Sequence, residues 1–151
     1  MFRTLTCTVA AVLFAGAAQA HVSVRPRESK PGATEKYIVR VPTEGKVATT
    51  SVEVDIPQGV VVDAVEPADG VKSEMKREGG RVVSITWTVT IEPGANRELT
   101  FTAKNPTEGT EIVWKAHQRY GDSTSSEWVG APGTRQPAPV TKLTAATGPA
   151  R

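Results

Sequence analysis

Hydrophobic and polar residues alternate along most of the chain after residue 20. The alternation is clearest in the segments 37–41, 51–56, 83–91, 98–103 and 112–117. A period of two predicts strands with one buried and one solvent-facing side, as in antiparallel sheets. The residues predicted to face inward are Tyr37, Val39, Val41, Val52, Val54, Ile56, Val83, Ile85, Trp87, Val89, Ile91, Leu99, Phe101, Ala103, Ile112, Trp114 and Ala116.

Proline and glycine separate these segments at predicted turns. Turn candidates occur at 30–32, 57–59, 78–80, 92–94, 105–106 and 131–133. No segment sustains a helical period over three turns. The charged stretch 70–78 fits a helical turn, a solvated strand or a loop equally well. Short strands at this spacing predict an all-β fold, an antiparallel β-sandwich of about seven to nine strands.

The two ends of the chain differ from this pattern. Residues 1–20 combine Arg3, an apolar run and the sequence Ala18-Gln19-Ala20, which predicts a secretory signal peptide cleaved before His21. The cleaved protein is then expected in the periplasm or secreted. One domain is predicted over 21–143, followed by a flexible tail, 144–151, that contains no core residues and no hydrophobic anchor.

Cleavage changes what the composition allows. The remaining 131 residues contain no cysteine and one methionine, and their formal net charge is +1. Disulfides, thiolate catalysis, thiolate metal sites and a methionine-rich Cu(I) site are therefore excluded. The nearly balanced charge argues against a nucleic-acid-binding protein. The sequence contains no nucleophile elbow, P-loop, dinucleotide-binding or zinc-protease motif.

The predicted cleavage point gives His21 chemistry that an internal histidine lacks. Its free α-amine and its Nδ1 can close a six-membered chelate ring on one metal ion. An α-amine has a pKa near 8 and yields its proton readily to a metal. Two such nitrogens suit Cu(II), the strongest binder among the divalent first-row ions. The alternative is that histidine follows the cleavage site by chance.

Other candidate ligands are ambiguous by pattern alone. Glu53, Glu98 and Glu127 are each either a carboxylate ligand or a solvated charge on the polar side of a strand. His117 is either a ligand or a histidine at the surface or rim of the fold. Trp128, between polar residues and glycine, is either a core residue or an indole that shields a metal.

Eight motifs, in order along the chain, carry a family resemblance. They are HVSVRP (21–26), PGA (31–33), EKY (35–37), TTSVEVDIPQGV (49–60), ITW (85–87), FTAKNP (101–106), QRYGD (118–122) and EWVG (127–130). With them the chain resembles the YcnI-like family of exported copper-binding domains. It departs from that family at Val71, where members often have tryptophan. This difference is expected to affect packing and to leave the metal site intact.

The resemblance implies an immunoglobulin-like or cupredoxin-like sandwich that binds one Cu(II) per chain. It implies a monohistidine brace, formed by the amine and imidazole of His21, with Glu53 as the acidic ligand and Trp128 nearby. Some family members carry a C-terminal membrane anchor, which this sequence lacks.

The leading hypothesis is a Cu(II) metallochaperone or store that is not an enzyme. Its partners would be copper and other periplasmic copper-trafficking proteins. One alternative is a copper-dependent polysaccharide monooxygenase, which would need His117 as a second histidine ligand. The other is an immunoglobulin-like interaction module that binds no metal and pairs through a strand edge.

Overall fold

A computed structural model describes residues 21–145 of the chain. The predicted signal peptide and residues 146–151 of the predicted tail lie outside this range. Every regular element within it is a strand, so the all-β prediction is confirmed. These residues also contain no helix long and apolar enough to cross a membrane.

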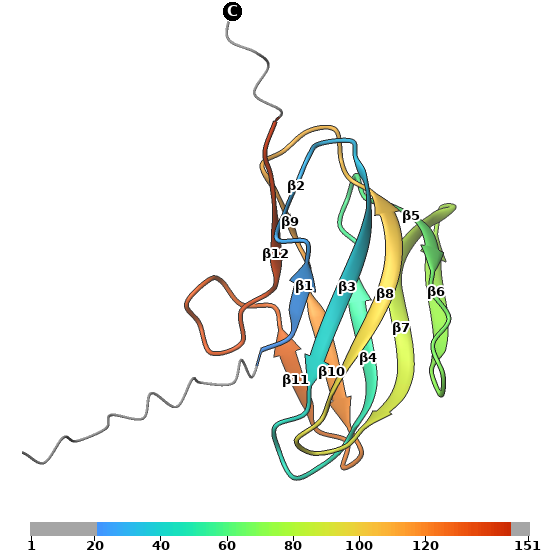
Figure 1. Cartoon of the computed structure of the whole chain (residues 1–151), viewed down its shortest axis with the longest axis vertical. Helices are drawn as coiled ribbons and strands as arrows, with labels where there is room; N and C mark the ends of the chain where they lie inside the picture. Colours follow the sequence, from blue (N-terminus) through green and yellow to red (C-terminus); the bar gives the residue numbers. More distant parts are fainter. Residues whose placement is uncertain (1–20, 146–151) are drawn as a thin grey trace, which may run out of the picture.

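The strands form three sheets (Figure 1). The first has the order β1-β3-β8-β5, from Ser23–Arg25, Thr34–Pro42, Asn96–Lys104 and Val61–Val65. The second has the order β11-β10-β4-β7-β6, from Ser125–Trp128, Ala116–Tyr120, Thr49–Asp55, Arg81–Ile91 and Lys72–Glu78. The small third sheet has the order β2-β12-β9, from Glu28–Ser29, Val140–Leu143 and Glu111–Val113.

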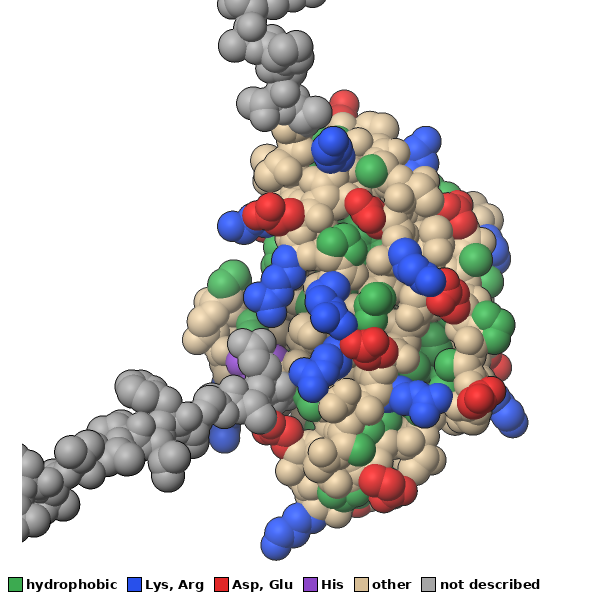
Figure 2. Space-filling model, in the orientation of Figure 1, with side chains coloured by type: hydrophobic (Ala, Val, Ile, Leu, Met, Phe, Trp, Pro, Cys, Tyr) green, Lys and Arg blue, Asp and Glu red, His purple; other side chains and the backbone are tan. Residues whose placement is uncertain are grey.

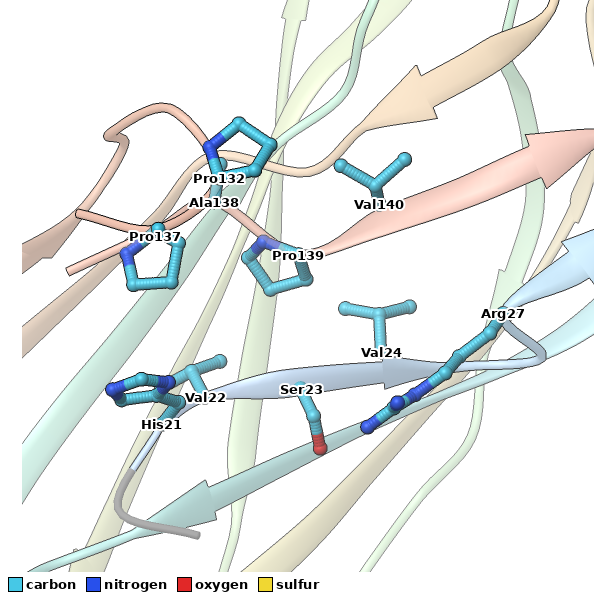
Figure 3. Close-up of a pocket in the computed structure, with 11 residues that line it drawn as sticks. His21, Val22, Ser23, Val24, Arg27, Pro132, Pro137, Ala138, Pro139 and Val140 are labelled. Atoms are coloured by element: carbon cyan, nitrogen blue, oxygen red, sulfur yellow. The ribbon is translucent and has the colours of Figure 1, made fainter. Parts of the chain in front are cut away.

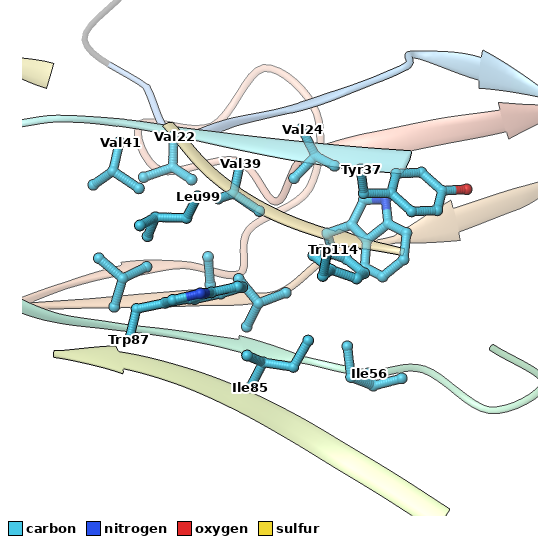
Figure 4. Packing of buried hydrophobic residues seen from close by; sticks show 14 of the residues in the cluster. Val22, Val24, Tyr37, Val39, Val41, Ile56, Ile85, Trp87, Leu99 and Trp114 are labelled. Carbon is cyan, nitrogen blue, oxygen red and sulfur yellow. The ribbon is translucent and has the colours of Figure 1, made fainter. Parts of the chain in front are cut away.

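The core lies between the first two sheets (Figure 4). Val39 and Leu99 point inward from the first sheet, and Ile85 and Trp87 point inward from the second. All four side chains are at most 1% exposed. Burial of inward-facing rows from two sheets is the packing that the alternating sequence predicts, so the sandwich is confirmed.

Aromatic residues join this core to the third sheet. The ring centroid of Trp114 lies 4.8 Å from that of Tyr37, and Trp114 donates its indole N–H to Thr141 Oγ1 at 3.0 Å. Thr141 in turn donates to the carbonyl of Pro26 at 2.8 Å. The buried indole therefore fixes β12 and the segment after β1 relative to each other.

Two details of the strand predictions differ from the structure. Val83 was predicted to face inward, but Val82 and Ser84 are the buried residues there. A register shift between Lys76 and Arg77, where β6 pairs with β7, changes the alternation at this end of β7. The described residues contain twelve strands, more than the predicted seven to nine, because several have only two to four residues.

Of the three structures that the sequence allows for the charged stretch 70–78, the protein adopts the strand. Most of it is β6, in which all seven residues are exposed. As the last strand of its sheet, β6 pairs only with β7, and charged side chains suit such an edge. Basic and acidic side chains are interspersed over the face shown in Figure 2, in keeping with the balanced charge.

Candidate metal centre

His21 lies at the edge of the sandwich, two residues before the first residue of β1. Val22 and Val24 are 3% and 2% exposed and anchor this segment in the core, while His21 itself is exposed. Ser23 of β1 pairs with Arg40 of β3. Continuing that antiparallel register places His21 beside the end of β3, where the chain leaves the sheet.

Trp128, the last residue of β11, lies against His21. The two ring centroids are 5.5 Å apart, and the rings are inclined at 56°. Trp128 pairs with the small residue Ala116 of β10 and is only 6% exposed. The indole is therefore both a core side chain and a neighbour of the imidazole.

A buried glutamine fixes the orientation of this indole. Gln118 of β10 is fully buried, and its Oε1 accepts the Trp128 indole N–H at 3.0 Å. Its amide nitrogen donates to the carbonyl of Pro42 at 2.9 Å and to Thr49 Oγ1 at 2.7 Å. Gln118 thus ties β11 to β4 and to the end of β3. The functional motifs of the sequence do not single out Gln118, although the alternation through Trp114 and Ala116 continues to an inward position at 118.

His21 and Trp128 line a polar pocket of about 310 Å³. Besides His21, its charged lining residues are Glu44, just beyond the end of β3, and Arg135. The other lining residues are Pro42, Gln118, Tyr120, Ser126 and Gln136. An imidazole and a carboxylate at one exposed pocket are a ligand combination that Cu(II) accepts.

The loop after β11 closes one side of this pocket. Gly130 donates its N–H to the carbonyl of Gln136 at 2.9 Å, and Ala138 donates to the carbonyl of Gly130 at 2.9 Å. A Cβ on Gly130 would lie 2.4 Å from Thr134 Oγ1 and 2.9 Å from the Gln136 carbonyl. Glycine is therefore required for this close approach. Figure 1 shows the loop beside the start of β1.

His21 also lines a second hollow (Figure 3). Its volume is about 340 Å³, and prolines of the loop face β1 across it. The labelled prolines are Pro132, Pro137 and Pro139. His21 therefore lines both a polar and a mainly apolar depression.

The structure does not bring Glu53 to His21. Its neighbours Val52 and Val54 on β4 point into the core, so Glu53 points to the outer face of the second sheet. There its Oε2 accepts a hydrogen bond from Thr86 Oγ1 at 3.0 Å. Glu44 is the acidic residue that lines the His21 pocket. Finding it from sequence would have required the register of β1 against β3.

His117 also points to the outer face, because Ala116 and Gln118 on either side of it are buried. Its Nε2 lies 3.2 Å from Asp55 Oδ2, and its Nδ1 contacts Glu127 Oε2. The two histidines therefore lie in different sites. A copper brace that uses both is not assembled.

Two pKa values are shifted at this outer cluster. Burial alone would lower the pKa of His117, but its hydrogen bonds to Glu127 and Asp55 and their negative charges outweigh burial and raise it. The hydrogen bond from His117 is the main reason that the pKa of Glu127 lies below its usual value. Each shift stabilises the charged form of the residue concerned.

These shifts predict a pH-dependent stability in the absence of metal. The His117 contribution is fully present below its unfolded pKa of about 6.5 and is lost as pH rises through the higher folded value. The Glu127 contribution is present above its unfolded pKa of about 4.3 and is lost as pH falls. We expect Glu127→Gln to reduce the free energy of unfolding most near pH 5.5, by about 1 kcal/mol or less for so exposed a pair.

Urea denaturation of both proteins at pH 5.5 and pH 9, with a chelator present, measures this difference. A difference that is equal at the two pH values, or larger at pH 9, would contradict the assignment of charges.

Comparison with known proteins adds a family and a fold. The family described as Domain of unknown function (DUF1775) matches residues 21–143. The protein named "Copper-binding protein CutI" from Bacillus subtilis (strain 168) is 37% identical over 138 residues. The aligned region covers 89% of this chain and 68% of that protein.

Solved structures agree with the sandwich. An uncharacterised Nocardia farcinica protein with an immunoglobulin-like fold superposes with a TM-score of 0.75 and 26% identity, covering 83% of this chain and 99% of that one. A non-cellulosomal cohesin from Archaeoglobus fulgidus gives a TM-score of 0.50 at 11% identity, covering 83% and 91% of the two chains. The cohesin match supports the fold alone.

Proposed function

The chain belongs to the DUF1775 family, the YcnI-like family that its motifs indicated, and from this premise we propose that it is an exported copper-binding protein. One Cu(II) binds at His21 after the signal peptide is removed. The protein acts in the periplasm as a metallochaperone or store. The copper-binding relative from Bacillus subtilis supports the choice of metal.

The observation that carries the proposal is the position of His21. It is an exposed residue at the first position after the predicted cleavage site, with its ring against Trp128 and with Glu44 lining the same pocket. The α-amine and Nδ1 would supply two nitrogen ligands, and Glu44 would supply an oxygen ligand in the place first predicted for Glu53. This neutral-nitrogen and anionic-oxygen set fits Cu(II).

The surroundings of His21 suit a copper ion that is transferred to a partner protein. With His21 and Glu44 as its ligands, the ion would keep coordination positions open for water or for a ligand from a partner protein. Trp128 covers one side and is held by Gln118. The mainly apolar hollow that His21 also lines leaves an approach to the imidazole open.

A thermal unfolding scan with and without Cu(II) tests the proposal. Copper at about 100 times its dissociation constant is expected to stabilise the chain that begins at His21 by roughly 2.7 kcal/mol. The melting temperature should therefore rise. An interaction module that binds no metal predicts the same melting temperature in both scans.

Two matched substitutions test which carboxylate binds the copper. We expect Glu44→Gln to weaken Cu(II) binding about tenfold or more, equivalent to about 1.4 kcal/mol, because it removes the anionic ligand. Glu53→Gln removes the same charge on the opposite face of the sheet and should leave copper binding at His21 unchanged. Both variants also carry Asp55→Asn, so that the outer cluster around His117 does not contribute, and isothermal titration gives their affinities for Cu(II). Weakening by Glu53→Gln alone would overturn the role given to Glu44.

A further inference from the structure

Three neighbouring strands of the second sheet place metal-ligating side chains together on its outer face. His117 of β10 lies directly opposite Glu53 of β4 and Glu127 of β11 in the strand register. Asp55 lies two residues after Glu53 and so on the same face. One ligand atom from each of Glu53, Asp55 and His117 lies within 4.8 Å of the others. All three residues are partly buried.

The imidazole of His117 is held in an orientation that suits a ligand. Its Nδ1 contacts Glu127 Oε2, while its Nε2 faces Asp55 Oδ2 at 3.2 Å. Metal-ligating histidines commonly donate their second ring N–H to a carboxylate, which fixes the tautomer and orients the ring. Glu127 occupies that position here, and its other oxygen accepts a hydrogen bond from Ser125 Oγ at 3.0 Å.

The carboxylates are supported by the sheet and form no close ion pair with lysine or arginine among the described residues, although the charge of Arg119 acts on Glu127 at longer range. Thr86 on β7 donates to Glu53, which holds that carboxylate in place. Among residues 21–145, no Lys or Arg nitrogen lies within 4.0 Å of the carboxylate oxygens of Glu53, Asp55 or Glu127. The carboxylates of Glu53 and Asp55 thus lie close together beside one imidazole. Like charges this close favour a bound cation.

We propose that Glu53, Asp55 and His117 form a second metal site, for a divalent first-row transition ion such as Zn²⁺, with Glu127 orienting His117. One imidazole nitrogen and two carboxylate oxygens are ligands that Zn²⁺ accepts, and three protein ligands leave a fourth position for water. Magnesium and calcium are disfavoured because they prefer sites made of oxygen alone. The site is separate from His21 and does not depend on the copper proposal.

Zinc titration of a chain that lacks the amino-terminal chelate tests this site. The protein is residues 21–151 preceded by one alanine, so that His21 has no free amine. Calorimetry with ZnCl₂ should show one Zn²⁺ per chain. Asp55→Asn and His117→Gln should each abolish this binding, and Glu127→Gln should weaken it by about 10- to 100-fold, as for other outer partners of ligating histidines.

The control is Glu98→Gln, which removes an exposed carboxylate that pairs with Arg25 on the other sheet. It should bind Zn²⁺ like the parent chain. A measurement on the unsubstituted side chains guards against variants that fail to fold: the NMR signals of the His117 ring should shift on addition of Zn²⁺. Absence of zinc binding, or zinc binding that leaves the His117 signals in place and survives Asp55→Asn, would overturn the proposal.

Discussion

Replacing Gln118 with leucine is expected to lower the free energy of unfolding by about 3 kcal/mol. Leucine has a similar volume, so the cavity left behind is small. The loss comes from the hydrogen bonds to Trp128, Pro42 and Thr49. Each buried polar group left without a partner costs about 1–3 kcal/mol. Thr49 keeps a partner in Thr43, so the cost falls mainly on the indole N–H and the Pro42 carbonyl.

Denaturation in urea at fixed pH measures this loss. The matched control is Gln58→Leu, because Gln58 is an exposed glutamine in the turn between β4 and β5. Exposed substitutions of this kind usually change stability by less than about 0.5 kcal/mol. If the two variants were equally stable, Gln118 would not be the residue that joins the ends of β3, β4 and β11.

The alternating segments identified the inward-facing strands correctly where the pairing is regular. Val39, Val54, Trp87 and Leu99 are all buried as predicted, because a half-buried strand shows its inner row directly in the sequence. The prediction failed at Val83, where the change of register opposite β6 shifts the inner row by one residue. Such a shift depends on the partner strand and is not visible in either strand alone.

The candidate metal site was only partly predictable, because part of it is assembled by the pairing of strands that are distant in sequence. His21 follows from the cleavage motif, and Trp128 from the family resemblance. The structure places their rings together. Glu53 lies on a strand whose alternation already placed it on the polar side, away from the core. Glu44 lies in the connection between β3 and β4, which has no alternation of hydrophobic and polar residues. Its proximity to His21 arises from the pairing of β1 with β3, which links residues far apart in sequence.

The central claim is that copper binds through the α-amine and imidazole of His21. Its most direct test is Cu(II) titration of two chains, one beginning at His21 and one with a single alanine before it. Both chains carry Asp55→Asn, so that the outer cluster does not contribute. Calorimetry with glycine as a competing chelator gives the affinity.

The chain that begins at His21 should bind one Cu(II), and the added alanine should weaken that binding at least about 100-fold, or about 2.7 kcal/mol. The extension removes the free amine and the chelate ring while leaving the imidazole, Glu44 and Trp128 unchanged. Equal affinity of the two chains for Cu(II) would contradict the account.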